Sequence, residues 1–147
     1  MKNLRELAIN AREYAEAVQK RQHNLEGACH ENALGSGDCI RYNTDYDPIL
    51  VWGSFQTDPD EEPPKSIRES DQRGLTHFWI ELKNQPNSVI DIYALPEDWS
   101  SSNFSKGDVY CGSLPEEYNR LQMHEYYGKV ESSDLLSASS FENVTSR

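Results

Sequence analysis

Three features of this 147-residue sequence predict an α+β fold, with N-terminal helices packed on a small antiparallel sheet and a further helix near the C-terminus. An apolar stripe with helical spacing opens the chain, β-branched and aromatic runs fill its middle, and a helix-capping pattern stands near its end. Strands that follow one another through short turns indicate an antiparallel sheet with the helices to one side. Residues 1–130 are expected to form one domain, followed by a Ser-rich, disordered tail at 131–147.

Two helices are expected at the start of the chain. Residues 3–21 carry apolar side chains at the spacing of one helix face, with polar and charged residues on the other face. That stripe consists of Leu4, Leu7, Ala8, Ala11, Tyr14, Ala15 and Val18. After a break at 22–28, residues 29–34 are expected to form a short helix, which the glycine-rich run at 35–38 should end.

The middle of the chain is typical of strands. Residues 39–42 predict a short strand and residues 48–55 a mostly buried one. Residues 76–82 and 88–93 flank a polar turn and predict a hairpin. Between these strands, residues 56–74 hold three prolines and many charges, which indicates a long acidic surface loop.

Another helix is expected near the C-terminus. Residues 95–112 look irregular, and Ser113 to Glu116 then form a capping box with Pro115 in the first turn. The pattern predicts a helix through about Tyr127, closed by Gly128.

Composition excludes several classes of function. The net charge is −11 and the basic residues are scattered, which argues against a nucleic-acid partner. The sequence has no run of ~18 apolar residues, so no membrane span is predicted. We also see no apolar segment of a signal peptide, and we therefore expect a cytoplasmic protein. Three cysteines in such a protein do not predict a disulfide framework. The acidic composition fits a halophilic host or its virus, and it also fits an ordinary acidic protein.

Cys29 stands where the second helix is expected to begin. The first N–H groups of a helix have no intrahelical partner and carry partial positive charge, which stabilises a thiolate. The backbone N–H of Cys29 could also donate to a developing oxyanion. Cys29 is therefore a candidate nucleophile, although a lone cysteine is more often a small buried hydrophobe.

A nucleophilic cysteine needs a base and a group that orients the base, and His77 and Asp91 are the candidates. If the hairpin loop has an odd number of residues, for example 84–86, both side chains share one sheet face within hydrogen-bond reach. A four-residue loop without a bulge would put them on opposite faces. The strand at 76–82 should direct His77, Trp79 and Glu81 to one face, and Phe78, Ile80 and Leu82 to the other.

Residues 25–94 resemble the transglutaminase-like and papain-like cysteine enzymes. The resemblance rests on G-x-C-x-x-x-A-L at 27–34, an apolar strand ending in Gly53, H-F-W-I-E at 77–81 and V-I-D at 89–91. The segment is most similar to short phage and haloarchaeal proteins with C-[HY]-x-N-A, then H-x-W-[VI]-E, then an aspartate on the next strand. This resemblance implies a papain-like or transglutaminase-like fold with Cys29 as nucleophile, His77 as general base and acid, and Asp91 as the orienting residue.

The implied function is cysteine-dependent acyl transfer, as a peptidase, an amidase or a transglutaminase-like enzyme. Its substrate would be a peptide, protein or other amide, and no cofactor is needed. Gln22 could take the place of the papain-like oxyanion glutamine. Asn32 and Trp79 could support the site, or they could be an exposed helix position and a packing residue. The alternative is an inactive member of the fold that binds a partner as an accessory or virion-associated protein.

Metal binding is a further alternative. Cys29, His30, Cys39 and Cys111 have the soft donor atoms that zinc prefers. They lack the paired C-x2-C or H-x3-H spacing of known zinc sites, so no metal is predicted. Nothing in the sequence predicts an oligomeric state.

Overall fold

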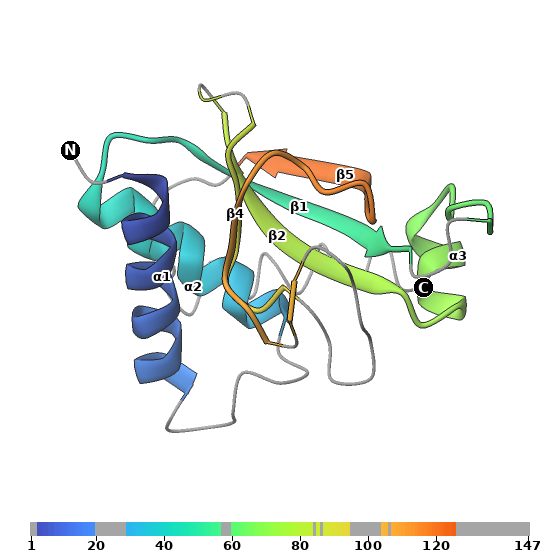
Figure 1. The fold of residues 1–147 in the computed structure, drawn as a ribbon, viewed down its shortest axis with the longest axis horizontal. Coiled ribbons are helices and arrows are strands. Elements are labelled where there is room, and N and C mark those ends of the chain that lie inside the picture. Colours follow the sequence, from blue (N-terminus) through green and yellow to red (C-terminus); the bar gives the residue numbers. More distant parts are fainter. Residues whose placement is uncertain are drawn as a thin grey trace.

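The computed structural model describes residues 3–19, 29–56, 60–83, 85, 87–94, 104–105 and 107–125. Within them the fold is α+β, as predicted (Figure 1). The elements are α1 (Leu4–Gln19), α2 (Cys29–Asn43), β1 (Pro48–Phe55), α3 (Ile67–Gln72), β2 (Thr76–Leu82), β3 (Val89–Asp91), β4 (Tyr110–Gly112) and β5 (Tyr118–Glu125). The expected domain end near 130 and the Ser-rich tail at 131–147 lie outside the described residues.

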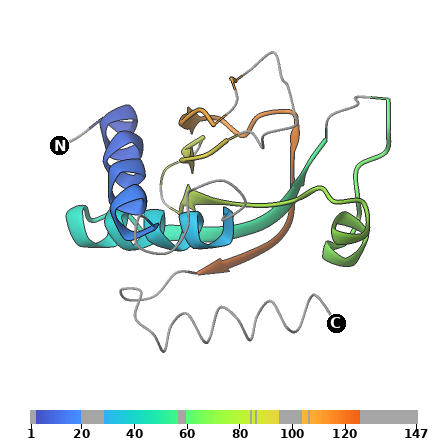
Figure 2. The same cartoon turned by 90° about the horizontal axis from the view of Figure 1, so that it is seen from below.

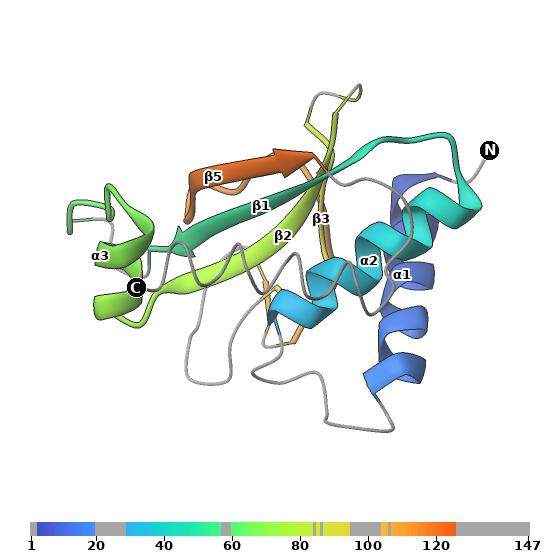
Figure 3. The same ribbon diagram turned by 180° about the vertical axis from the view of Figure 1, so that it is seen from behind.

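The strands form one antiparallel sheet in the order β4-β3-β2-β1-β5, with a cluster of buried apolar side chains on each face. Helices α1 and α2 cover one face (Figure 2), with α2 against β2 and β1 and α1 packed on α2 (Figure 3). The sheet contributes Leu50, Trp52, Phe78, Ile80, Leu82, Ile90 and Ile92 to that cluster. The opposite face carries Val51, Phe55, Trp79, Val89, Ala94, Phe104 and Tyr118.

Helix α1 matches the predicted stripe, but α2 is much longer than the sequence indicates. It runs from Cys29 to Asn43, through both glycines at 35 and 37, so the expected stop at 35–38 and the expected strand at 39–42 are wrong. The glycines do not end α2, because small residues let α1 and α2 pack closely. A Cβ at Gly35 would lie 3.7 Å from the Cβ of Ala15, and Tyr14 Oη donates to Asp38 Oδ2 at 2.6 Å.

That hydroxyl contact links the middle of α2 to α1. The hydrogen bond to Asp38, together with burial and the charge of Asp38, raises the pKa of Tyr14 to about 12. Tyr14 therefore stays a neutral donor throughout the physiological pH range. Buried small residues complete the helix pair, with Ala8, Ala11 and Ala15 on α1 and Ala33 and Ser36 on α2.

The β2–β3 hairpin has the register that the sequence allowed. Ile80 pairs with Ile90 and Glu81 with Val89, so paired residue numbers have an even sum. The side chains of β2 alternate as expected, because Phe78, Ile80 and Leu82 belong to the helix-side cluster and Trp79 to the opposite one. His77 and Asp91 therefore lie on the same face of the sheet.

Two further expectations about the chain are wrong. The region 113–127 does not contain a helix up to residue 125: β5 begins at Tyr118 and pairs with β1, with Tyr118 opposite Phe55. Pairing with the free edge of β1 outweighs the local capping pattern. The expected loop at 56–74 contains α3, capped by Ser66, whose side chain accepts from Glu69 N at 3.1 Å.

Gly53 is expected to be intolerant of any side chain, because β1 approaches its neighbours most closely there. An added Cβ would meet Asn119 O and the ring of Trp79, each at 2.3 Å. Gly53→Ala should lower the free energy of unfolding by about 1–3 kcal/mol in urea titrations. Gly35→Ala is the control, since its Cβ has ordinary contacts and alanine favours a helix. Equal stability of the two variants would contradict this packing.

Candidate functional site

One face of α2 lies over the strands that carry His77 and Asp91. Cys29, Asn32, Ala33 and Ser36 follow the three- and four-residue spacing of a helix face, and all four line a small pocket. The pocket is small, with room for about one water molecule. Its other walls are His77, Phe78, Trp79, Ile90, Asp91, Ile92 and Tyr93.

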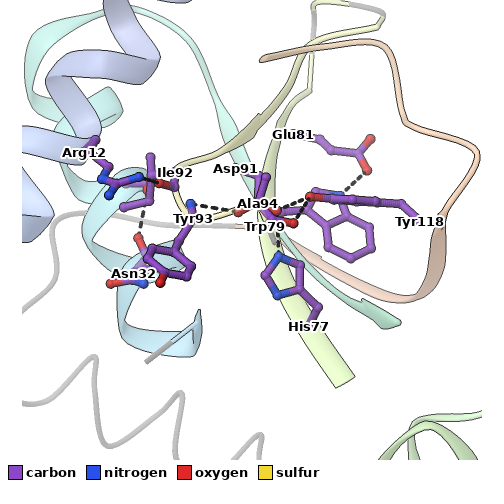
Figure 4. A network of polar contacts seen from close by, with 11 residues as sticks. Arg12, Asn32, His77, Trp79, Glu81, Asp91, Ile92, Tyr93, Ala94 and Tyr118 are labelled. Carbon is purple, nitrogen blue, oxygen red and sulfur yellow. Dashed lines mark hydrogen bonds and ion pairs between the residues drawn. The ribbon is translucent and has the colours of Figure 1, made fainter. Parts of the chain in front are cut away.

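His77 and Asp91 form a buried pair, as Figure 4 shows. His77 Nε2 lies 2.6 Å from Asp91 Oδ2, and the two side chains are only 4% and 5% exposed. With its Nε2 directed at the carboxylate, the imidazole has Nδ1 left for another partner. Cys29 lines the same pocket as His77 and adds to the polar influences on its ring. The structure thus brings together the three residues that sequence reasoning selected.

The pair favours a charged imidazole. Burial alone would lower the pKa of His77, but the charge and hydrogen bond of Asp91, helped by Cys29, raise it to about 10. His77 is therefore an imidazolium at neutral pH, held between a carboxylate and a thiol.

The Asp91 carboxylate is held on both oxygens. Oδ1 accepts from the backbone N–H of Tyr93 at 3.3 Å. Oδ2 accepts from His77 and also from the hydroxyl of Tyr118 (Figure 4). Three donors on a buried carboxylate favour one orientation of the group.

Tyr118 is the part of this network that the sequence did not reveal. The sequence predicts a helix at this position. In the structure Tyr118 belongs to β5, lies opposite Phe55 of β1, and makes edge-on ring contacts with Phe55 and His77. Burial and the adjacent Asp91 charge raise the pKa of Tyr118 well above its ordinary value, so it remains a donor. The alternation of Tyr118, Arg120 and Gln122 was the available strand signal.

Trp79 packs against other residues and does not face the solvent. Its ring is 1% exposed, and its Nε1–H donates to Glu81 Oε2 at 2.9 Å. Glu81 in turn pairs with Arg120 through two hydrogen bonds of 2.8 and 2.7 Å. This chain of contacts ties β2 to β5 and stabilises the sheet face beside His77.

The remaining supporting candidates differ in position. Asn32 is not an exposed helix residue: it is 2% exposed and lines the pocket beside Cys29 and His77. Gln22 lies outside the described residues. His30, next to the cysteine, packs against Phe78 with the two rings tilted and their centroids 4.6 Å apart.

Among the described residues, no group of three or more His, Cys, Asp or Glu side chains gathers in a way that could hold a metal ion. None of the helices described has the length and apolar character needed to cross a membrane.

In comparisons with known proteins, no family model, no curated protein and no solved structure matches this chain.

Proposed function

We propose that this protein is a cysteine-dependent acyl-transfer enzyme with Cys29, His77 and Asp91 as its catalytic triad. The observation that carries the proposal is the buried His77 ring, which has one nitrogen on Asp91 and the Cys29 thiol as its other polar neighbour. A nucleophile, a base and an orienting group in mutual contact are the parts that covalent acyl transfer requires. A papain-like or transglutaminase-like fold is part of this proposal and rests on the resemblance of residues 25–94.

The reaction would begin from the thiolate and imidazolium forms of Cys29 and His77. The sulfur attacks the acyl carbon, a C–S bond forms, and the carbonyl electron pair moves to oxygen. The backbone N–H of Cys29, at the start of α2, is available to stabilise that oxyanion. The intermediate then collapses, the bond to the leaving nitrogen breaks, and the leaving amine takes the proton from His77.

Release of the acyl group reverses these roles. Neutral His77 removes a proton from water, or from a second amine, as that molecule attacks the thioester carbon. The C–S bond breaks, its electrons return to the Cys29 sulfur, and His77 is again an imidazolium. Water gives hydrolysis, as in a peptidase or amidase, and an amine gives transfer, as in a transglutaminase.

Acetylation by p-nitrophenyl acetate tests the proposal without knowledge of the natural substrate. The folded protein should gain one acetyl group, mapped by mass spectrometry to Cys29, with a burst of nitrophenolate. Cys29→Ser should lose the burst, whereas Cys111→Ser, which removes a half-buried cysteine on β4, should keep it. Absence of an acetyl group on Cys29 under conditions that label Cys111 would refute the proposal and favour a non-catalytic, partner-binding protein.

A further inference from the structure

Tyr118 contacts two members of the proposed triad, Asp91 and His77. It is the first residue of β5, its side chain is buried, and its ring lies among Phe55, Trp79 and Phe104. The hydroxyl at the end of this ring donates to Asp91 Oδ2, the same oxygen that His77 Nε2 approaches to 2.6 Å. The same hydroxyl also lies 3.3 Å from the carbonyl oxygen of Ala94.

We propose that Tyr118 is a positioning residue of the catalytic site, which acts through Asp91 to hold the His77 ring in line with Cys29. This inference rests on the proposed function, since it assigns Tyr118 a role in that same triad. Tyr118 does not reach the reacting atoms. Its effect on Cys29 passes through two hydrogen bonds, from hydroxyl to carboxylate and from carboxylate to imidazole.

The geometry of Asp91 explains why a second donor on Oδ2 matters. Oδ1 has only the long 3.3 Å contact with Tyr93 N, so it constrains the rotation of the carboxylate weakly. Tyr118 approaches Oδ2 from the aromatic cluster on the same sheet face as His77, and it fixes the oxygen at the position that His77 requires. Without the hydroxyl, the carboxylate can turn, and the imidazole that follows it loses its alignment with the thiol.

The choice of partner also indicates a role beyond sheet stability. The backbone carbonyl of Ala94 lies 3.3 Å from the hydroxyl, which is long for an O–H···O hydrogen bond. The hydroxyl instead lies closer to the charged oxygen of the triad. The titratable groups that surround His77 are then Cys29 from α2, Asp91 from β3 and Tyr118 from β5, and the last of these remains neutral.

Tyr118→Phe is the direct test, because it removes the hydroxyl and keeps the ring. The control is Tyr110→Phe: Tyr110 also packs against Phe104, with centroids 5.3 Å apart, but its hydroxyl donates to Ser113 O. Alkylation of Cys29 by iodoacetamide at pH 6 is followed by mass mapping. Loss of a hydrogen bond to a charged group should slow Tyr118→Phe about tenfold. Tyr110→Phe should react as the wild type does.

His77→Ala, measured in parallel, separates the two proposals. If His77→Ala slows alkylation and Tyr118→Phe does not, Tyr118 is a packing residue and this inference fails while the triad stands. If His77→Ala leaves the rate unchanged, the proposed function fails and the inference with it. If both substitutions slow the reaction and Tyr110→Phe does not, the positioning role is supported.

A measurement on the unaltered protein covers the case in which Tyr118→Phe does not fold. Proton NMR should show a slowly exchanging hydroxyl resonance of Tyr118, with a cross-peak to the ring N–H of His77. A Tyr118 hydroxyl that exchanges as fast as that of the exposed Tyr42 would overturn the inference.

Discussion

Replacing Asp91 with Asn is expected to reverse the pH dependence of the stability that His77 contributes. In the native fold the pKa of His77 is raised from 6.5 to about 10. Its stabilising contribution is therefore complete below about pH 6.5 and is lost as the pH rises through 10. In Asp91→Asn only burial remains as a strong influence, and burial lowers the pKa of the ring. The variant should then lose stability as the pH falls below about 6.5.

The difference between the two proteins should be largest in acid. At pH 5 the unfolded variant binds a proton on this imidazole that the buried, unpaired ring resists, and breaking a buried ion pair costs about 3–5 kcal/mol. Urea unfolding at pH 5, 7 and 9 measures the effect. Asp108→Asn, an exposed aspartate near β4, is the control for the change in net charge. A stability difference between wild type and Asp91→Asn that does not vary with pH would show that His77 is not charged in the native fold.

Replacing His77 with Ala is expected to slow acetylation of Cys29 by about a hundredfold or more at pH 6. The substitution removes both the positive charge that stabilises the thiolate and the group that exchanges its proton, and general acid–base groups contribute about 10²–10⁴-fold. Stopped-flow measurement of the nitrophenolate burst gives the rate.

His124→Ala is the matched control for this change. His124 lies exposed on β5, where its ring contacts Gln122. Its removal alters the histidine content of the chain without altering the environment of Cys29. Equal burst rates for His77→Ala and the wild type would exclude His77 as the base.

The hairpin and the contact between His77 and Asp91 were predictable because they depend on local periodicity. The two-residue period of a strand fixes which side chains share a face, and the register of a short hairpin follows from its turn. The sequence left two loop lengths open, and the pairing of Ile80 with Ile90 selects the one that unites the two residues. Cys29 at the start of α2 was likewise predictable from a local signal.

The incorrect predictions have the opposite origin. They occur where contacts between residues far apart in the sequence outweigh the local conformational preference. Gly35 would end an isolated helix, yet α2 continues because Ala15 of α1 packs against it. The capping box at 113–116 indicates a helix, yet the segment that follows it forms β5, which pairs with the edge of β1. Tyr118 was missed for this reason, since only the pairing with β1 brings it to Asp91.

The central claim is that Cys29 is held as a reactive thiolate by His77, and its rate of alkylation as a function of pH tests this most directly. Iodoacetamide labelling of the folded protein between pH 5 and 9, resolved by mass mapping, reports Cys29, with Cys111 as a second thiol in the same sample. We expect a Cys29 rate that remains high at pH 6. A Cys29 rate that rises only around pH ~8.5, as for a free cysteine, would contradict it.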